Sequence, residues 1–327
     1  MATTVMPENR AKRRREAKNE TRKRSMNAST VAAVVLIIVG VIAILYPIVS
    51  TLHNNAASSR IADQMTVEAK QMEPDRREML MEQMREYNRS LRTNPVHPGI
   101  PEQMEIQPSP EYKAYLDVGK PDFQFTDAFS EVVIPDVDIR LPIYKGSGSH
   151  ALNRGAGHLF GTTLPVGGEG TNTTITAHTG LATASMFDNL INLKEGQDIY
   201  ISTLGEVMRY RMVGSKVVPP ETVDAIPPVD ESNEDRLFLI TCTPYGLNFH
   251  RLVVEAHRIP LDGDDPDLNI ANSVGPWQTW MTIVAVIFVV LMAGLTWLLW
   301  SGRKNRKNRQ NNTNAESENS TLVQEED

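Results

Sequence analysis

The stretch RLFLITCTPYGLNFHRLVVEA, residues 236–256, contains two apolar runs separated by turn-forming Pro, Tyr, Gly and Asn residues. Residues 236–241 and 252–256 are short and rich in apolar and β-branched side chains, and this composition favours two strands joined in a hairpin. Cys242 lies at the end of the first predicted strand, and Arg251 opens the second. The spacing therefore predicts that Cys242 and Arg251 lie close together across the hairpin.

Similar short apolar runs, separated by Pro and Gly, continue on the amino-terminal side of this hairpin. Many short strands within about 130 residues favour a mainly β domain, folded as a closed or nearly closed antiparallel barrel. A helix is expected at residues 183–192. The other predicted strands are residues 132–134, 141–144, 173–176, 198–203 and 207–213.

Cys242 is the only cysteine among the 327 residues, so the chain cannot form an internal disulfide. A lone cysteine is either a small buried hydrophobic residue or a nucleophile that the chemistry requires. A strand end suits the second role because the sheet holds an exposed side chain still. An arginine beside such a cysteine could stabilise a thiolate or a developing oxyanion.

A cysteine nucleophile needs a partner that exchanges a proton near neutral pH, and histidine is the usual one. Among the seven histidines, His178 follows a strand-like run and begins a His-Thr-Gly turn, a setting like that of Cys242. His250 is the local alternative, but adjacent strand residues point to opposite faces. If Arg251 faces the cysteine, His250 does not. Spacing alone leaves a purely structural role open for His178.

Two apolar runs without charge, residues 31–49 and 277–300, are each about long enough to cross a membrane as helices. The first could instead be a signal peptide, although it lacks a clear cleavage site. Basic clusters precede the first run and follow the second, which places both termini in the cytoplasm at the cell membrane. These clusters favour contact with anionic lipid rather than with nucleic acid. The intervening domain is then extracytoplasmic.

These patterns divide the chain into seven segments. A Met-rich polar stretch predicts a helical stalk that Pro74 interrupts, with Leu80, Met84, Tyr87 and Leu91 on one face. Residues 94–110 contain five prolines and are a candidate lid. The segments are a cytoplasmic basic tail (1–25), a transmembrane helix (26–50), an extracytoplasmic stalk and candidate lid (51–130), a catalytic β-barrel (131–260), an acidic linker (261–276), a second transmembrane helix (277–300) and a cytoplasmic tail (301–327).

Three separated motifs resemble those of class C, or pilin-polymerising, sortases of Gram-positive cell walls. They are TAHTGL around His178, FLITCTPYG around Cys242 and NFHRLVV around Arg251. The similarity runs from about residue 132 to 260. It includes LPIY at 141–144 and the GTTLPVGG loop. Two departures are Phe238, where the family usually has Thr, and the lack of an Asp-Pro-aromatic lid anchor between residues 94 and 127.

This resemblance implies an eight-stranded sortase β-barrel with short helices, flanked by two transmembrane helices. It further implies a cysteine transpeptidase that cleaves an LPXTG-like sorting signal between Thr and Gly through a thioacyl enzyme. Cys242 would be the nucleophile, His178 the general acid and base, and Arg251 the oxyanion and substrate stabiliser. Neither a cofactor nor a metal is implied.

The expected acceptor is a lysine amine of a pilin, so that the product is a pilus fibre. A peptidoglycan amine, which would anchor proteins to the cell wall, is the alternative within the same family. A non-catalytic β-barrel scaffold with a buried cysteine is the alternative from another class. Membrane lipid is a further expected partner, and nucleic acid is not.

Overall fold

The computed structural model describes residues 28–96, 105–220, 233–261, 273–294, 296, 297 and 300. The predicted cytoplasmic tails, most of the acidic linker and the central part of the candidate lid lie outside these residues. The chain forms two compact units, residues 1–50 and 51–327, and the features below belong to the second unless stated otherwise.

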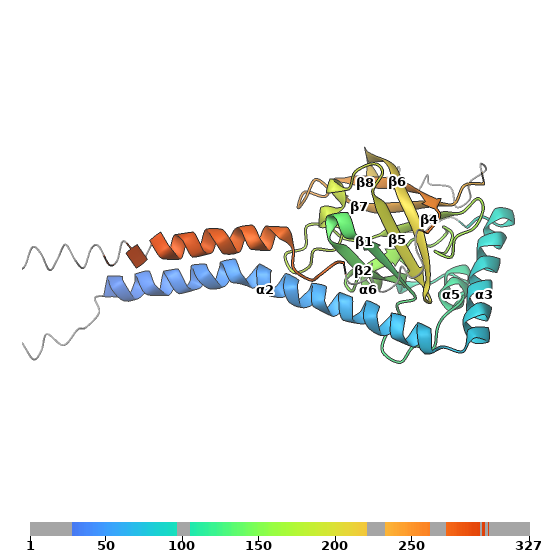
Figure 1. Ribbon diagram of the computed structural model, residues 1–327, viewed down its shortest axis with the longest axis horizontal. Coiled ribbons are helices and arrows are strands. Elements are labelled where there is room, and N and C mark those ends of the chain that lie inside the picture. Colours follow the sequence, from blue (N-terminus) through green and yellow to red (C-terminus); the bar gives the residue numbers. More distant parts are fainter. Residues whose placement is uncertain are drawn as a thin grey trace, which may run out of the picture. The chain divides into compact units, whose positions relative to one another are not determined.

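The larger unit is built around a closed eight-stranded barrel with the strand order β1-β2-β3-β4-β7-β8-β6-β5 (Figure 1). This confirms the predicted mainly β fold. The strands are β1 (Ser130–Ile134), β2 (Ile139–Lys145), β3 (Ala156–His158), β4 (Asn172–Thr176), β5 (Asp198–Thr203), β6 (Glu206–Val218), β7 (Arg236–Thr243) and β8 (His250–Ile259).

Strand β5 shows most clearly the alternation of buried and exposed residues that is typical of a strand. In β5, Ile199 and Ile201 are fully buried while their neighbours are partly exposed, which is the period of two that a barrel wall requires. Strand β3 has only three residues, too few for such a pattern, and the sequence did not reveal it.

Two sequence expectations about the barrel are wrong. The barrel is not entirely antiparallel, because β2 pairs with β3 and β4 pairs with β7 in parallel. The helix expected at residues 183–192 is reduced to the 3-10 turn η2 (Asp188–Asn192). Residues preceding η2 form a loop instead, since their polar groups bond to distant segments described below.

Helix α2 (Ala28–Gln71) ends just before Pro74, and α3 (Pro74–Thr93) begins at that proline. The predicted interruption is thus confirmed, because proline lacks an N–H and fits the first turn of a helix. Leu80 and Met84 of α3 lie in the main core, Tyr87 packs against it and Leu91 is also buried, as their spacing predicts. This apolar face holds α3 on the barrel.

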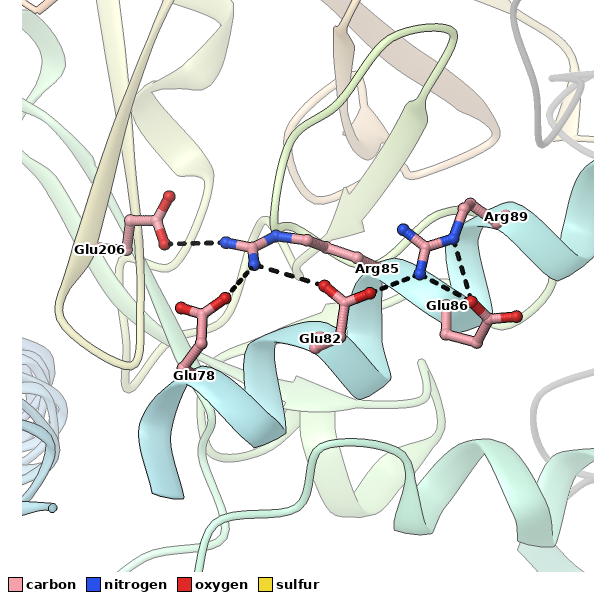
Figure 2. A network of polar contacts seen from close by, with 6 residues as sticks. All are labelled: Glu78, Glu82, Arg85, Glu86, Arg89 and Glu206. Atoms are coloured by element: carbon pink, nitrogen blue, oxygen red, sulfur yellow. Dashed lines mark hydrogen bonds and ion pairs between the residues drawn. The ribbon is translucent and has the colours of Figure 1, made fainter. Parts of the chain in front are cut away.

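The opposite face of α3 carries a network of charged side chains (Figure 2). Arg85 contacts Glu78 of its own helix at 2.8 Å and Glu206 of β6 at 3.4 Å. Arg89 contacts Glu82 and Glu86 at 2.5 and 2.7 Å. Solvent-exposed ion pairs contribute little to stability, so the apolar face of α3 provides most of its docking energy.

A buried histidine fastens α5 (Pro110–Asp117) to the barrel. The Tyr115 hydroxyl lies 2.7 Å from Nδ1 of His158, and Nε2 of the same ring lies 2.8 Å from the Thr163 carbonyl oxygen. Because a carbonyl only accepts, Nε2 carries the proton and Nδ1 accepts from Tyr115. Burial lowers the pKa of His158 to about 4, so this ring is neutral near pH 7.

One helix in the described part of the chain is long and apolar enough to cross a membrane. Its candidate span is Val35–Gln71, with a mean hydropathy of 2.7 in its most apolar window. A second apolar helix, Thr279–Gly294, is shorter. The second predicted span includes positions outside the described residues, so the two-span arrangement stays a prediction.

Candidate active site

Strands β4, β7 and β8 lie next to one another in the barrel; β7 and β8 carry Cys242 and Arg251, and His178 follows the end of β4. In the antiparallel pair β7 and β8, Cys242 is the direct partner of Arg251, and Thr243 is the partner of His250. The predicted closeness of Cys242 and Arg251 across the hairpin is therefore confirmed.

The parallel pairing of β4 with β7 brings the third residue alongside. Thr176, the last residue of β4, pairs with Ile240. The alignment continues beyond the strand, since the Ala177 N–H donates to the Ile240 carbonyl at 3.2 Å and the Thr241 hydroxyl donates to the Ala177 carbonyl at 2.8 Å. If this alignment is extended by one residue, His178 lies alongside Cys242.

All three residues belong to the outer face of the barrel. Ala177, Leu239 and Leu252 point into the main core, each an odd number of positions from the site residue on its own strand. Successive strand residues alternate between faces, so Cys242, His178 and Arg251 point outward. His250, which pairs with Thr243, falls on the other face, as the alternation argument predicts.

An apolar strip continues from Cys242 along the same outer face. Phe238, Ile240 and Val253 form a small buried cluster, with Val218 of β6 packed against it. This cluster is separate from the main core. It lies beside the cysteine, because Ile240 and Cys242 are two positions apart on β7 and so share a face.

The turn after His178 is fixed by Asp188 at the start of η2. The Asp188 carboxylate accepts hydrogen bonds from the Thr179 hydroxyl and the Gly180 N–H, both at 2.8 Å. The Phe187 N–H donates to the His178 carbonyl at 3.0 Å and closes the loop. Nothing in the sequence pattern marked Asp188 as part of the site, because its role depends on this loop closure.

The β4–η2 loop also packs against the β7–β8 loop. Gly180 has a φ of +79°, and a Cβ at this position would lie 2.9 Å from the Gly246 nitrogen. A larger residue is thus excluded both by backbone conformation and by space. The Gly in the His-Thr-Gly motif lets the two loops meet beside Cys242 and His178.

The β7–β8 loop, which directly follows Cys242, exposes three large apolar side chains. Tyr245, Leu247 and Phe249 are 63%, 67% and 55% exposed. Arg251 is held at one nitrogen, where Nη1 donates to the Asn248 and His250 carbonyls at 3.1 and 3.2 Å. These contacts orient the guanidinium, and the loop offers an apolar border to a bound ligand.

The electrostatic setting is that of a partly desolvated site. Burial lowers the pKa of His178, so the neutral imidazole is favoured at pH 7. Burial raises the pKa of Asp188, although the hydrogen bonds from Gly180 and Thr179 oppose this. Cys242 is partly exposed, which disagrees with the alternative of a cysteine buried in the core. Among the described residues, no group of three or more His, Cys, Asp or Glu side chains could hold a metal ion.

Comparison with known proteins agrees with this geometry. The sortase domain model matches residues 132–259. The structure of sortase A from Corynebacterium diphtheriae is 40% identical, covers 66% of this chain and 99% of its own, and has a TM-score of 0.54. Sortase C from Streptococcus pneumoniae is 32% identical, covers 63% of this chain and 100% of its own, and has a TM-score of 0.53. The chain belongs to the sortase family.

Curated relatives match a shorter part of this sortase. Sortase A of Streptococcus agalactiae is 34% identical over 115 residues, which is 34% of this chain and 45% of that protein. The chain thus spans just under half the length of the curated relatives that it matches. The match to sortase C of S. pneumoniae, described in terms of pilin substrate specificity, extends beyond the barrel and confirms the resemblance to class C.

Proposed function

We propose that this sortase is a cysteine transpeptidase in which Cys242 is the nucleophile. The observation that supports this most directly is the pairing of Cys242 with Arg251 across β7 and β8, together with the hydrogen bonds that align Ala177, the residue before His178, with Ile240 and Thr241. A thiol, an imidazole and a guanidinium in adjacent positions suffice for acyl transfer without a cofactor.

In the first step, the neutral His178 imidazole takes the proton of the Cys242 thiol, and the resulting thiolate attacks the threonine carbonyl carbon of an LPXTG-like sorting signal. A carbon–sulfur bond forms, and negative charge develops on the carbonyl oxygen, where the Arg251 guanidinium stabilises it. His178 donates a proton to the leaving glycine nitrogen as the carbon–nitrogen bond breaks. The products are a thioacyl enzyme and the released carboxy-terminal tail of the substrate.

In the second step, an amine attacks the thioester carbonyl carbon. His178 accepts a proton from this amine, a new amide bond forms, and the Cys242 thiolate leaves. A pilin lysine is the acceptor that the class C likeness favours, and the product is then a fibre joined by isopeptide bonds. A peptidoglycan amine would give wall anchoring instead. Mass spectrometry of the cross-linked product, locating the amine, separates these two.

Membrane anchoring fits this chemistry. We propose that both apolar helices span the cell membrane with both termini in the cytoplasm, so that the barrel is extracytoplasmic and the helices contact lipid. Sortase and an anchored LPXTG protein would then meet in two dimensions at raised effective concentration. Reaction of engineered cysteines near each terminus with a membrane-impermeant reagent in intact cells would contradict this topology.

The decisive experiment is intact-mass analysis of the detergent-solubilised full chain mixed with an LPXTG peptide. We expect a peptide adduct on Cys242 in the wild type and none in Cys242→Ala, with equal membrane expression of the two proteins. Continued adduct formation in the variant would refute the nucleophile assignment. An unmodified wild-type protein would favour the scaffold alternative.

A further inference from the structure

The loop between β4 and η2, residues 179–187, is held from two sides by segments that are remote in the sequence. One segment is the part of α2 that directly follows the apolar stretch, and the other directly precedes the carboxy-terminal apolar helix. Both flank predicted membrane spans. The loop itself connects His178 to Asp188, so its conformation determines where the imidazole lies.

Asn55 of α2 joins all three segments with one side chain. Its Nδ2 donates to the Ser185 hydroxyl and to the Pro276 carbonyl, both at 3.2 Å. Its Oδ1 accepts from the Ser185 N–H at 3.3 Å. The neighbouring Asn54 donates to the Thr183 carbonyl at 2.8 Å. Asn55 thus uses its amide N–H donors on two segments, the loop at Ser185 and the carboxy-terminal segment at Pro276.

The carboxy-terminal segment makes a second attachment through Gln278, which is 2% exposed. Its Oε1 accepts from Asn189 Nδ2 at 2.8 Å, and its Nε2 donates to the Asp138 carbonyl at 3.1 Å. Asn189 follows Asp188 directly in η2. The attachment therefore fixes the same turn of η2 that supplies the carboxylate bonded to Thr179 and Gly180.

The loop contains a strained residue between these attachments. Met186 has a φ of +41°, although it is not glycine, and it is buried. This conformation is unfavourable for an L-amino acid and persists only where the surroundings impose it. Ser185 on one side is bonded to Asn55, and Phe187 on the other is bonded to the His178 carbonyl. Releasing Ser185 would let the backbone relax and would loosen the bond to His178.

We propose that Asn55 is a positioning residue for His178, and that the two membrane-flanking segments brace the catalytic loop together. The role given to His178 rests on the proposed function, whereas the brace rests on the hydrogen bonds alone. Without the hydrogen bonds from Asn55, the His178 imidazole lies beside Cys242 for less of the time. Proton transfer then slows, while the β7–β8 hairpin that carries Cys242 and Arg251 stays in place.

The test is Asn55→Ala in the detergent-solubilised full chain, with Asp63→Asn as the matched control. Asp63 docks the same helix through Arg140 of β2 at 2.7 Å, not through the loop. For Asn55→Ala we expect kcat to fall about ten- to hundredfold with KM within about twofold, since small misplacements of a catalytic group cost this much. For Asp63→Asn both constants should stay within about twofold.

A second readout does not depend on activity. Histidine side-chain NMR, assigned with His178→Gln, should show the His178 pKa moving up toward its ordinary value in Asn55→Ala, because the loosened loop admits water. Gln278→Ala should shift it in the same direction, which covers the case that Asn55→Ala fails to fold. A wild type without thioacyl adduct would refute the proposed function, yet this titration would still report on the brace.

Either of two results would overturn the proposal. An unchanged His178 titration in Asn55→Ala, together with a lowered melting temperature, would make Asn55 a purely structural residue. An equal fall of kcat in Asp63→Asn would show that general helix docking is responsible, and not the attachment to Ser185.

Discussion

His158 lies on β3, His178 follows the neighbouring strand β4 by two residues, and the two rings have opposite settings. His158 ends β3, and its partner on β4 is Ile175, three residues before His178. His158 is fully buried, and both of its ring nitrogens are hydrogen-bonded. His178 is partly exposed on the outer face, and its ring forms no hydrogen bond within the described residues. A histidine with both nitrogens engaged stabilises the fold, whereas one with a free ring beside a thiol is available for proton transfer.

The largest effect that this comparison predicts is on catalysis by His178→Ala. We expect the rate of thioacyl formation to fall by roughly 10²–10⁴-fold, because general acid–base catalysis contributes that much. The melting temperature should stay close to that of the wild type, since the ring is not part of the core. Single-turnover adduct formation and thermal unfolding measure the two. A mild loss of rate would return His178 to a structural role.

Arg251→Ala should have the next largest effect, a fall of about 10²–10³-fold in the same rate, because one oxyanion donor is removed. Arg251→Lys should restore only part of it, since an ammonium lacks the planar fork of the guanidinium. Arg236 on β7, whose guanidinium pairs with Glu234 at 2.8 Å, supplies the control. If Arg236→Gln lowers the rate equally, the general positive charge of this face is responsible.

The smallest effect concerns stability and belongs to His158. Its pKa is about 4 in the folded protein and 6.5 ordinarily, so the unfolded chain binds the extra proton as the pH falls. The free energy of unfolding should decrease between pH 6.5 and 4 by up to about 3 kcal/mol. Urea unfolding of the full chain, followed by near-UV circular dichroism, measures this. The His158→Leu variant should be less stable at pH 7, but its free energy of unfolding should decrease less between pH 6.5 and 4 than that of the wild type. An equal decrease in both proteins would show that His158 is not the group responsible.

Features determined by neighbouring residues were predictable from the sequence. The short run rich in β-branched residues at 198–203 predicted β5 with its observed bounds, and Pro74 marked the break between α2 and α3. Cys242 and Arg251 are nine positions apart on one hairpin, so their pairing followed from local turn chemistry. Strand alternation argued against His250, whereas the catalytic role of His178 needed the family resemblance, because spacing alone left a structural role open for it.

Features determined by distant residues were not predictable in this way. The sequence does not indicate that β4 lies parallel to β7, yet this pairing brings Ala177 to Thr241, 64 positions later, and so His178 to Cys242. It likewise gives no sign that Asn55 bonds to Ser185 across 130 positions. Hydrophobic period and turn residues act over a few positions and fix strands and hairpins by themselves. Which strands become neighbours, and which side chains hold the catalytic loop, depends on closure of the whole barrel, and only the tertiary structure decides it.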